Sequence, residues 1–530
     1  MRKLLLLGDE ALAQGALDAG LSGVYAYPGT PSTEITEYIQ NSPEAEDYRI
    51  HCDWSTNEKT ALEAAIGMSY SGKRALVCMK HVGLNVAADP FMNASIVGAN
   101  GGLVIVSADD PSMHSSQNEQ DSRVYGKFAL IPTLEPSNQQ ECYDMVQYGF
   151  EISEKYKIPV LMRLTTRLSH SRCGVECREP KVQNRLHIPE NLKQFILLPA
   201  ISRRNYKSLL LKQVDFVSHG ETDGWNVLTM GENNKYGIVT SGIAYNYLME
   251  NYPDRKVPYP VLKITQYPLP TNMLIKLAAE TEELIIIEEG YPFIEEQVKG
   301  IIPGNLVVHG RLDGTLPRDG ELNPNLVAAA LGIKTADLKV VPDVVKARPP
   351  KLCDGCPHIS TYNAINAALA DYTPGRVFAD IGCYTLGALP PYNAINSCVD
   401  MGASITMAKG ASDAGIFPAI AVIGDSTFTH SGMTGLLDAV LDKAPITVFI
   451  LDNETTAMTG GQDSAAYSRI ESICKGIGVE ENHIKVITPL PKYQDDNVKV
   501  IKEELEYKGV SVIIPRRECL QTIGKKKRRH

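Results

Sequence analysis

The stretch that decides the fold is GDSTFTHSGMTGLLDAVLDKAPITVFILDNETTAMTGGQ, residues 424–462. It follows the apolar run Ile416–Ile423, which is typical of a buried parallel strand. A helical segment at Gly432–Leu441 and a second apolar strand at Ile446–Leu451 come next. Strand, helix and strand in this order predict a parallel α/β unit whose ligand site lies where the strands end.

Each of these two strands ends at a polar side chain. Asp425 follows the first strand and Asn453 follows the second. Carboxylate and amide oxygens are hard ligands, and Mg²⁺ prefers a few of them together with the oxygens of a phosphate. A Gly-Asp pair alone fits a simple strand–turn element, but the spacing and the two strands favour a site for a metal-bound phosphate.

Length and composition describe a globular chain with several domains. The chain has 530 residues, of which 44% are hydrophobic and 22% are charged, so it can form several apolar cores. The net charge of −10 argues against a nucleic acid as partner. The only strongly basic stretch is the tail Lys525–His530, which is typical of a solvated end.

The sequence indicates neither a membrane span nor a secretion signal. No run of about 18 apolar residues is present, so we expect no transmembrane helix and no membrane partner. Met1–Leu7 imitates a signal peptide, but its apolar run is short and Gly8-Asp9-Glu10 follows, so it predicts a first strand. Eleven cysteines without a secretion signal indicate reduced thiols or metal ligands in a cytoplasmic protein.

The order of strand-like and helix-like segments predicts three doubly wound α/β domains with parallel sheets. The first domain, residues 1–180, has five strand candidates: Leu4–Leu7, Val24–Tyr27, Ala75–Met79, Leu103–Val106 and Val160–Arg163. Residues 181–235 are predicted to form a linker with short helical pieces. The second domain, residues 236–341, begins with a strand at Ile238–Thr240. A proline-rich linker, residues 342–352, precedes the third domain, residues 353–530.

Two stretches of the first domain place polar residues at the start of a helix. Tyr27–Glu34 (YPGTPSTE) is a tight turn from strand to helix, in which Ser32 or Thr33 is the expected N-cap. Glu58 begins the helical segment Glu58–Ser69, where the helix dipole stabilises a carboxylate. By itself, each pattern fits an ordinary helix start.

Four of the cysteines form a pattern typical of a metal or cluster site. Cys353 and Cys356 lie in a C-x-x-C-P-H motif, Cys383 lies in DIGCY, and Cys519 follows the last predicted strand, Val510–Ile514. Four thiolates from three loops suit a [4Fe–4S] cluster. A tetrahedral zinc site uses the same ligands, and a lone C-x-x-C also fits a dithiol. The other seven are interpreted as structural or incidental: Cys52, Cys78, Cys142, Cys173, Cys177, Cys398 and Cys474.

Taken together, these motifs resemble the large subunit of indolepyruvate:ferredoxin oxidoreductase, a family of thiamine-dependent 2-oxoacid:ferredoxin oxidoreductases. The resemblance runs from the N-terminus to about residue 523 and rests on YPGTPSTE, NEKTALEAAIG, MKHVGLNVAADP, LCDGCPH, DIGCYTLG, MGASI, GDSTF with LDNETTAMTGGQ, and RREC. It implies a pyrimidine-binding domain at 1–180, a transketolase C-terminal-like domain at 236–341 and a diphosphate-binding domain at 353–530.

The resemblance implies a binding site for thiamine diphosphate and Mg²⁺. Asp425, Asn453 and the backbone carbonyl of Thr455 would hold the metal against the cofactor's diphosphate, beside Gly424 and Ser426. Ser426 is a departure, because the usual motif has a third glycine there. A bulky residue, here Met401, would lie under the bent cofactor.

In the first domain, the resemblance assigns catalytic roles to Glu58 and Thr30. Glu58 would hydrogen-bond the aminopyrimidine and promote deprotonation of the thiazolium carbon, a proton transfer that needs a positioned acid. Glu63 is the alternative, although it lies on a different helix face. Thr30 would face both substrate and cofactor. Cys353, Cys356, Cys383 and Cys519 match the ligands of a [4Fe–4S] cluster near the thiamine.

The expected substrate pocket lacks a feature of pyruvate-specific relatives, which hold the substrate carboxylate with an arginine of the first domain. The corresponding loop here is His114–Asn118, and no arginine follows until Arg123. We therefore expect a pocket for a larger 2-oxoacid, lined by Lys80, His81, Asn85, Gln117 and Asn118, with His81 as a further catalytic candidate.

The activity that the resemblance implies is oxidative decarboxylation of an arylpyruvate, with coenzyme A as co-substrate. Electrons would pass through the cluster to ferredoxin, and a smaller β subunit would complete a hetero-oligomer such as α₂β₂. Many relatives carry a C-terminal ferredoxin-like domain, and this sequence ends at His530 without one. Either electrons would pass from the cluster directly to another protein, or the sequence is a truncated form. The alternatives are a non-oxidative thiamine-dependent decarboxylase, an oxidoreductase for a different 2-oxoacid, and a non-catalytic relative.

Overall fold

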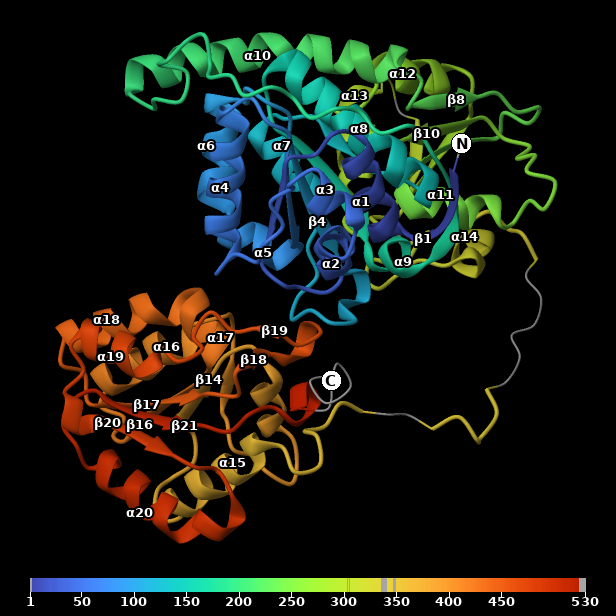
Figure 1. Cartoon of the computed structure of the whole chain (residues 1–530). Coiled ribbons are helices and arrows are strands. Elements are labelled where there is room, and N and C mark those ends of the chain that lie inside the picture. The colour runs from blue at the N-terminus through green and yellow to red at the C-terminus, as the bar shows by residue number, and fades with distance from the viewer. Residues whose placement is uncertain (1, 303, 305, 335–340, 347–348, 524–530) are drawn as a thin grey trace. The chain divides into compact units, whose positions relative to one another are not determined.

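The computed structural model of the chain describes all residues except 1, 303, 305, 335–340, 347–348 and 524–530 (Figure 1). The described residues form two compact units, Met1–Lys339 and Val340–His530, and each is considered by itself. They contain three large β-sheets of six, five and six strands, flanked by helices, which confirms the predicted α/β class. The basic tail Lys525–His530 and part of the predicted linker 342–352 lie outside the described residues.

The first sheet of the N-terminal unit has the strand order β11-β5-β6-β4-β3-β2. Neighbouring strands are parallel except β11, which pairs antiparallel with β5 at one edge. The strands are β2 (Gly23–Ala26), β3 (Ala75–Lys80), β4 (Leu103–Asp109), β5 (Thr133–Leu134), β6 (Val160–Thr165) and β11 (Gln266–Tyr267). The helices are α1 (Gly8–Asp18), α2 (Thr33–Gln40), α3 (Pro43–Asp47), α4 (Glu58–Tyr70), α5 (His81–Val86), α6 (Ala88–Val97), α7 (Arg123–Ala129), α8 (Gln139–Tyr156) and α9 (Thr166–His170).

Successive residues of the central strands belong to two different hydrophobic cores. In β3, Leu76 and Cys78 lie in the core that α1 and α8 line, whereas Val77 and Met79 lie in the core that α4 and α6 line. Helices therefore cover both faces of this sheet. This is the physical reason that its strands are continuous apolar runs rather than alternating ones.

The first strand does not belong to this parallel sheet, so that part of the prediction is wrong. β1 (Arg2–Leu7) pairs antiparallel with β7 (Arg172–Cys177) in a separate two-stranded sheet. Of its leucines, Leu6 is buried but Leu5 is 69% exposed. A strand that is buried on one face cannot occupy the middle of a sheet covered by helices on both faces.

The second sheet of the N-terminal unit has the order β13-β12-β9-β10-β8, with only β8 antiparallel. Its strands are β8 (Val227–Thr229), β9 (Tyr236–Ser241), β10 (Val261–Ile264), β12 (Glu283–Ile287) and β13 (Val307–His309). Its helices are α11 (Gly242–Met249), α12 (Thr271–Ala279), α13 (Phe293–Ile301) and α14 (Pro324–Ala330). The predicted strands at Ile238–Thr240 and Leu284–Glu288 correspond to β9 and β12.

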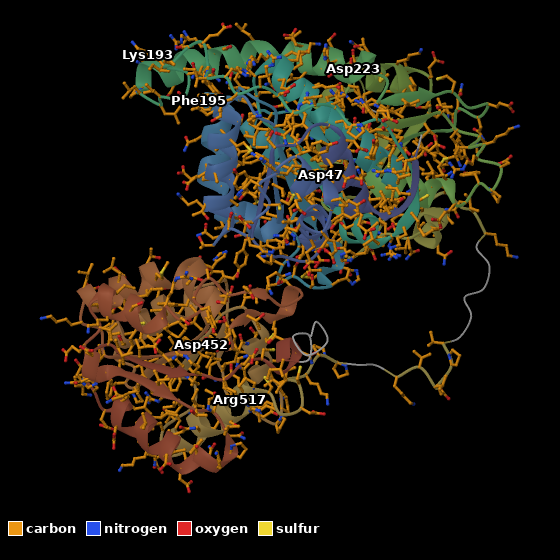
Figure 2. The ribbon with its side chains drawn as sticks, in the orientation of Figure 1. Asp47, Lys193, Phe195, Asp223, Asp452 and Arg517 are labelled. Atoms are coloured by element: carbon orange, nitrogen blue, oxygen red, sulfur yellow. The ribbon has the colours of Figure 1, made fainter. Side chains whose placement is uncertain are left out.

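The predicted linker 181–235 contains one long helix rather than short helical pieces. Helix α10 (Pro199–Thr222) has 24 residues, and only Leu209, Phe216 and Gly220 of it are buried. So few buried positions leave little apolar periodicity in the sequence, which is why the helix was not predicted. Ahead of α10, the ring of Phe195 packs 5.1 Å from that of Tyr70 (Figure 2). No described helix is both long and apolar enough to cross a membrane.

The sheet of the C-terminal unit has the order β15-β14-β16-β17-β21-β20, and all its neighbours are parallel. Its strands are β14 (Val377–Ala379), β15 (Ser397–Cys398), β16 (Ala419–Gly424), β17 (Ile446–Leu451), β20 (Ile484–Ile487) and β21 (Ser511–Pro515). Its helices are α15 (Pro357–Ala368), α16 (Ala403–Asp413), α17 (Asp425–Thr427), α18 (Met433–Leu441), α19 (Ile470–Ile477) and α20 (Gln494–Leu505).

The strand order of this sheet reverses at one point. The chain passes from β14 outward to β15 and then returns to β16 on the other side of β14. Loops that leave adjacent strands in opposite directions leave a crevice at their carboxyl ends, where open α/β sheets bind ligands. Asp380 follows β14 and Asp425 follows β16, so both predicted motifs, DIGC and GDS, lie at this point.

Candidate active site

The stretch of residues 424–462 lies at the edge of the C-terminal sheet at which β16 and β17 end. Gly424 pairs with Leu451 in this register, so the residues that follow them, Asp425 on one strand and Asp452 and Asn453 on the other, leave the sheet side by side. The side chains of Asp425 and Asn453 are buried. The sequence therefore placed these two predicted ligands correctly at neighbouring strand ends.

The carboxylate of Asp425 is only partly satisfied by the protein. Its Oδ1 accepts a hydrogen bond of 2.8 Å from the backbone N–H of Ser426, but its buried Oδ2 has no hydrogen-bond partner in the described part of the chain. Burial and the nearby Asp452 carboxylate raise the pKa of Asp425 to about 7, although hydrogen bonds from the Ser426 backbone and the Ser464 side chain lower it. A buried carboxylate oxygen without a partner is costly, and a cation there would remove that cost.

Asn453 and Thr455 lie in a turn that is tied to the Asp425 loop. Asn453 Oδ1 accepts from the Thr455 N–H at 3.3 Å, and the intervening Glu454 has a φ of +62°. The hydroxyls of Ser426 and Thr456 are 2.9 Å apart, which joins the two strand-end loops. Ser426, which stands where the usual motif has a glycine, thus has a structural role of its own.

Gly424 and Met401 are held through Tyr384 and Asp380, two residues that the sequence analysis did not assign. A side chain at Gly424 would put a Cβ 2.6 Å from the Tyr384 ring. The Tyr384 hydroxyl donates to Asp380, whose other oxygen accepts from the N–H of Gly402 at 3.2 Å. Gly402 has a φ of +96° and follows the half-buried Met401. Asp380 directly follows a strand, just as Asp425 does, and this position could have identified it from the sequence.

The four predicted cysteine ligands come together in the C-terminal unit. Burial and the neighbouring Cys519, Cys356 and Cys353 together raise the pKa of Cys383 to about 12, so the four cysteines lie near one another. The N–H of Cys519 donates to the carbonyl of Asn453 at 3.1 Å, which connects the cysteine group to the Asp425–Asn453 edge.

The segment that carries Cys519 also fixes the C-x-x-C loop. Nη1 of Arg517, a residue labelled in Figure 2, donates to the Gly355 carbonyl at 3.2 Å. Gln521 Nε2 donates to the sulfur of Cys353 at 3.5 Å. By contrast, Cys398 donates its S–H to the Asp380 carbonyl at 3.7 Å. These contacts between loops thus explain why the four cysteines lie together although they are far apart in sequence.

In the N-terminal unit, Glu58 lies in a buried position at the start of α4. Asn57 caps this helix, because its Oδ1 accepts from the Thr60 N–H at 2.9 Å. The Glu58 carboxylate packs on α5, where a Cβ at Gly83 would come within 2.5 Å of Glu58 Oε1. The alternative, Glu63, is exposed and pairs with Lys59 at the surface.

The predicted pocket residues of the N-terminal unit gather around the loop 114–120. Ser115 Oγ donates to the Thr30 carbonyl at 3.2 Å, and Lys80 Nζ donates to the Ser115 carbonyl at 3.3 Å. His81 is buried; its Nε2 lies 3.1 Å from the Asn118 carbonyl oxygen, and its Nδ1 has no hydrogen-bond partner among the described residues. Burial lowers the pKa of Lys80, whereas Asp110 and Glu58 raise it.

The turn that carries Thr30 is closed by its own side chains. Gly29 N–H donates to Thr33 Oγ1 at 3.0 Å, and Ser32 Oγ donates back to the Gly29 carbonyl at 2.8 Å. Ser32 is the N-cap residue of α2, as predicted, although its hydroxyl bonds the turn rather than the helix.

Two further predicted pocket residues, Gln117 and Asn85, have exposed side chains. Gln117 is exposed at the loop surface, and Asn85 is exposed with its Oδ1 accepting from the Tyr125 hydroxyl at 2.8 Å.

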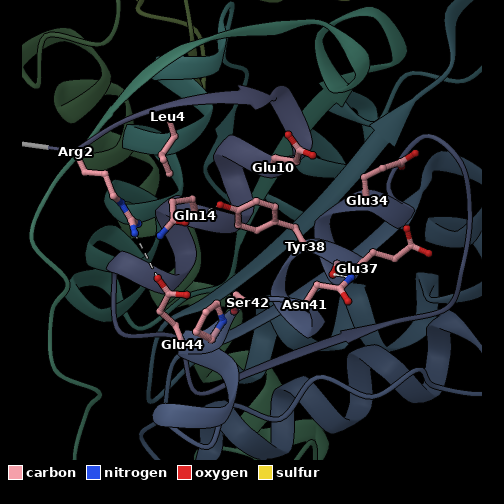
Figure 3. Close-up of a pocket in the computed structure, with 11 residues that line it drawn as sticks. Arg2, Leu4, Glu10, Gln14, Glu34, Glu37, Tyr38, Asn41, Ser42 and Glu44 are labelled. Atoms are coloured by element: carbon pink, nitrogen blue, oxygen red, sulfur yellow. Dashed lines mark hydrogen bonds and ion pairs between the residues drawn. The ribbon is translucent and has the colours of Figure 1, made fainter. Parts of the chain in front are cut away.

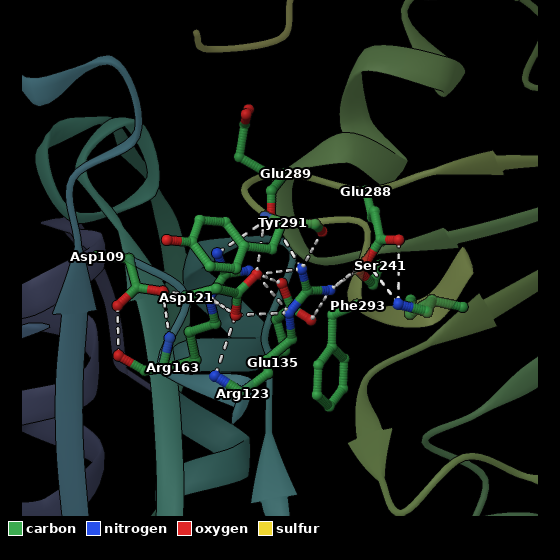
Figure 4. Close-up of polar contacts among 12 residues, drawn as sticks. Asp109, Asp121, Arg123, Glu135, Arg163, Ser241, Glu288, Glu289, Tyr291 and Phe293 are labelled. Carbon is green, nitrogen blue, oxygen red and sulfur yellow. Dashed lines mark hydrogen bonds and ion pairs between the residues drawn. The ribbon is translucent and has the colours of Figure 1, made fainter. Parts of the chain in front are cut away.

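Arg123 cannot hold a substrate, because it is fully buried in an ion network (Figure 4). Its guanidinium pairs with Asp121 and, at 2.9 Å, with Glu288 Oε2, and it also donates to the Glu289 carbonyl. The network continues through Arg163 to Asp109 and Glu135. The sequence analysis missed this network, which joins the ends of β4 and β6 to the end of β12.

Comparison with known proteins decides the family. Residues 14–198 match the family described as pyruvate flavodoxin/ferredoxin oxidoreductase, thiamine diphosphate-binding, and residues 380–514 match the C-terminal TPP-binding domain of thiamine pyrophosphate enzymes. Indolepyruvate oxidoreductase subunit IorA of Archaeoglobus fulgidus is 37% identical over 99% of this chain and 88% of its own length. The protein of the same name from Methanothermobacter marburgensis is 38% identical over 98% of this chain and 88% of its own length. The chain belongs to the indolepyruvate oxidoreductase large-subunit family.

Membership of this family makes the chain a thiamine-dependent 2-oxoacid:ferredoxin oxidoreductase subunit. A solved structure, 2-oxoglutarate:ferredoxin oxidoreductase from Magnetococcus marinus, shares the fold, with a TM-score of 0.51, 15% identity, and coverage of 62% of this chain and 65% of that chain. The first family match contains Thr30, Glu58 and His81, and the second contains Asp425 and Asn453. Each of the two units therefore contains a match to a thiamine diphosphate-binding domain.

Proposed function

We propose that this chain is the thiamine-binding subunit of an oxidoreductase that converts arylpyruvates, with coenzyme A, to aryl-acetyl-CoA and CO₂. The observation that carries the proposal is the near full-length similarity to relatives named indolepyruvate oxidoreductase subunits. The domain boundaries given above, with pyrimidine-binding, transketolase C-terminal-like and diphosphate-binding domains, form part of the same proposal. A smaller partner subunit completes the enzyme, because these relatives are themselves named as subunits.

The residues at the edge of the C-terminal sheet fit Mg²⁺ and a diphosphate. Asp425 Oδ2 is buried and without a described partner, Asn453 supplies an amide oxygen beside it, and the Thr455 carbonyl is the third protein ligand. Gly424 and Ser426 shape the start of the loop, and Met401 lies at the turn that Asp380 holds. Bound thiamine diphosphate supplies the nucleophilic carbon and the electron sink that decarboxylation needs.

Glu58 is proposed to hold the proton that the cofactor's aminopyrimidine exchanges. Its burial at a helix start, with Gly83 leaving room for its carboxylate, gives a fixed and partly desolvated acid. General acid–base catalysis requires such positioning. His81, whose buried Nδ1 is unpaired in the described structure, and Thr30 are proposed to face the substrate.

Cys353, Cys356, Cys383 and Cys519 are proposed to hold a [4Fe–4S] cluster that passes electrons to ferredoxin or another carrier. Four thiolates that come from three loops suit a [4Fe–4S] cluster. A tetrahedral zinc site uses the same ligands and is the alternative that the iron and zinc contents of the protein distinguish.

The substrate assignment depends on the absence of an accessible arginine near the predicted pocket. Arg123 is buried and paired, so within the described pocket residues Lys80 is the remaining cation. A pocket that does not close around a small carboxylate leaves room for an aromatic ring, whose burial contributes on the order of 2 kcal/mol or more.

Steady-state kinetics of the reconstituted complex test the proposed function. With coenzyme A and an artificial one-electron acceptor, we expect a higher kcat/KM for indolepyruvate and phenylpyruvate than for pyruvate. The binding energy of the ring, realised in the transition state, is the physical reason. A highest kcat/KM with pyruvate or 2-oxoglutarate would refute the arylpyruvate assignment while leaving the thiamine chemistry intact.

A further inference from the structure

Three potential metal ligands that the proposed function does not use meet in the N-terminal unit. Asp9 lies in the first turn of α1, Glu34 in the first turn of α2, and His170 at the end of α9. One ligand atom of each lies within 4.8 Å of those of the other two, and His170 Nε2 is 3.6 Å from Glu34 Oε1. The close approach of these elements is seen at Gly8, where a Cβ would lie only 2.2 Å from the Leu168 carbonyl oxygen.

Asp9 is the member of this group that points to a ligand. Its side chain is fully buried, and neither carboxylate oxygen has a hydrogen-bond partner in the described part of the chain. The outer oxygen of Glu34, Oε2, is also buried and unpaired there. The hydroxyl of Ser169 lies beside Asp9. Buried acceptors of this kind are costly unless a cation or a donor meets them.

Asp9 and Glu34 share the single imidazole of His170. The neighbouring carboxylate, Glu10, has its own partner, Arg172, at 3.8 Å. A divalent cation held by all three side chains would contact the buried carboxylate oxygens that lack a hydrogen-bond partner in the described part of the chain.

An ion can reach this group from solvent. Glu34 and His170 are each about one-third exposed at their side chains. Glu34 also lines a pocket of about 530 Å³, together with Glu10, Gln14, Tyr38 and Arg2 (Figure 3). The partly open side leaves positions for water, which metal sites with three protein ligands commonly bind as well.

We propose that Asp9, Glu34 and His170 bind a divalent transition-metal ion, Zn²⁺ in the first place. An imidazole with two carboxylates suits Zn²⁺ or Mn²⁺, whereas Mg²⁺ and Ca²⁺ prefer oxygen ligands alone. The ion connects the starts of α1 and α2 to the end of α9. Because α2 begins directly after the turn with Thr30, the ion fixes the N-terminal part of the substrate-facing surface.

The test compares Asp9→Asn and His170→Ala with the control Glu10→Gln in the full-length chain. Each protein is purified anaerobically, saturated with Mg²⁺ and thiamine diphosphate, and equilibrated with micromolar Zn²⁺. We expect the wild type and Glu10→Gln to bind one more zinc per chain than the two variants, with equal iron contents. His170 lies at the surface, so this variant remains informative if Asp9→Asn does not fold.

A second readout excludes zinc at the cysteines or at the Mg²⁺ site. Both tryptophans, Trp54 and Trp225, lie in the N-terminal unit, so their fluorescence reports the unfolding of that unit. Zn²⁺ should raise the unfolding temperature seen by tryptophan in the wild type and in Glu10→Gln but not in Asp9→Asn or His170→Ala. Equal zinc contents in all four proteins, or no zinc-dependent shift in the wild type, would overturn the proposal.

Discussion

At the scale of single residues, burial distinguishes Glu58 from Glu63, which the sequence analysis kept as the alternative. Glu58 and Glu63 lie on the same helix, α4, five positions apart. Glu58 is 5% exposed and packs against Gly83, whereas Glu63 is at the surface and pairs with Lys59. A surface ion pair of this kind contributes at most about 1 kcal/mol. Because Glu63 is exposed to solvent, it lacks the desolvated environment that we expect for the catalytic acid.

We therefore predict that Glu58→Gln retains thiamine diphosphate but loses turnover, by a factor of roughly 10² to 10⁴. The amide keeps the size of the side chain and cannot exchange the proton. Cofactor binding is measured by isothermal titration calorimetry. Turnover is measured in the reconstituted complex with an artificial one-electron acceptor. Glu63→Gln is the matched control from the same helix, and its activity should equal that of the wild type. Full activity in Glu58→Gln would remove this residue from the mechanism.

At the same scale, the sequence identified residues whose position follows from a strand end or a motif. Asp425 and Asn453 follow apolar strands, and the pattern alone placed them at one edge of the sheet. Asp380 has the same kind of position after β14, but its strand has only three residues and gave a weak signal. The unpaired state of Asp9 depends on the packing of α1 against α9, which no local pattern encodes.

At the scale of elements, the contact between α4 and α5 positions Glu58, the proposed catalytic glutamate. Gly83 is in α5, and an added methyl group would meet Glu58 Oε1 at 2.5 Å, Cγ at 2.7 Å and Cδ at 2.9 Å. These distances are shorter than any tolerated contact, so the carboxylate must move. Positioning errors of about 1 Å cost enzymes on the order of 10²-fold in rate.

Gly83→Ala is accordingly expected to lower kcat by about two orders of magnitude, with much smaller effects on folding. The control is Gly67→Ala in α4, where a Cβ has no neighbour within 4 Å. That substitution should leave kcat unchanged and stabilise the helix by up to about 1 kcal/mol. Activity assays and denaturant unfolding of both variants check the prediction. Equal kcat values for the two would show that Glu58 is not held through this contact.

The loops of the C-terminal unit lead to a prediction about the cysteines. Cys519 follows β21, and its backbone N–H donates to the Asn453 carbonyl, so the loop is anchored without the thiol. Cys519→Ser should keep the fold and yet lose most of the iron that the wild type binds, about four ions per chain. Cys398→Ser, which changes a nearby thiol, should keep all of it. Iron and zinc are counted by elemental analysis after anaerobic purification, and stoichiometric zinc in place of iron would contradict the cluster.

Elements were predictable where apolar runs are buried on both faces. The strands β3, β4, β16 and β17 were found for this reason. β1 was misplaced because its partner β7 lies far along the chain and only one of its faces is buried. Helix α10 was missed because its few buried positions, Leu209, Phe216 and Gly220, do not produce a helical pattern.

At the scale of the whole molecule, the buried ion network is a long-range feature of the N-terminal unit. It connects Asp109 at the end of β4, Arg163 in β6 and Glu288 directly after β12. Its members run from Asp109 to Glu289 in the sequence, so no local motif reveals them. Burial alone disfavours each charge, and only their mutual pairing compensates for it.

Arg123 is the central cation of this network and leads to the last prediction. Its removal in Arg123→Ala leaves the buried carboxylates of Asp121 and Glu288 without their closest partner. Breaking a buried ion pair in this way costs about 3–5 kcal/mol. The control is Arg167→Ala, which removes the half-exposed pair of Arg167 with Glu321 and should cost at most about 1 kcal/mol.

Both variants are unfolded in denaturant as full-length chains, with tryptophan fluorescence as the probe, because Trp54 and Trp225 lie in the N-terminal unit. We expect Arg123→Ala to shift the midpoint far more than Arg167→Ala does. Since Arg123 is fully buried, the Arg123→Ala protein that remains folded should keep the substrate preference of the wild type. Equal midpoints for the two variants would show that the network does not hold the sheets together, and a changed preference between arylpyruvate and pyruvate would show that Arg123 does influence the substrate site.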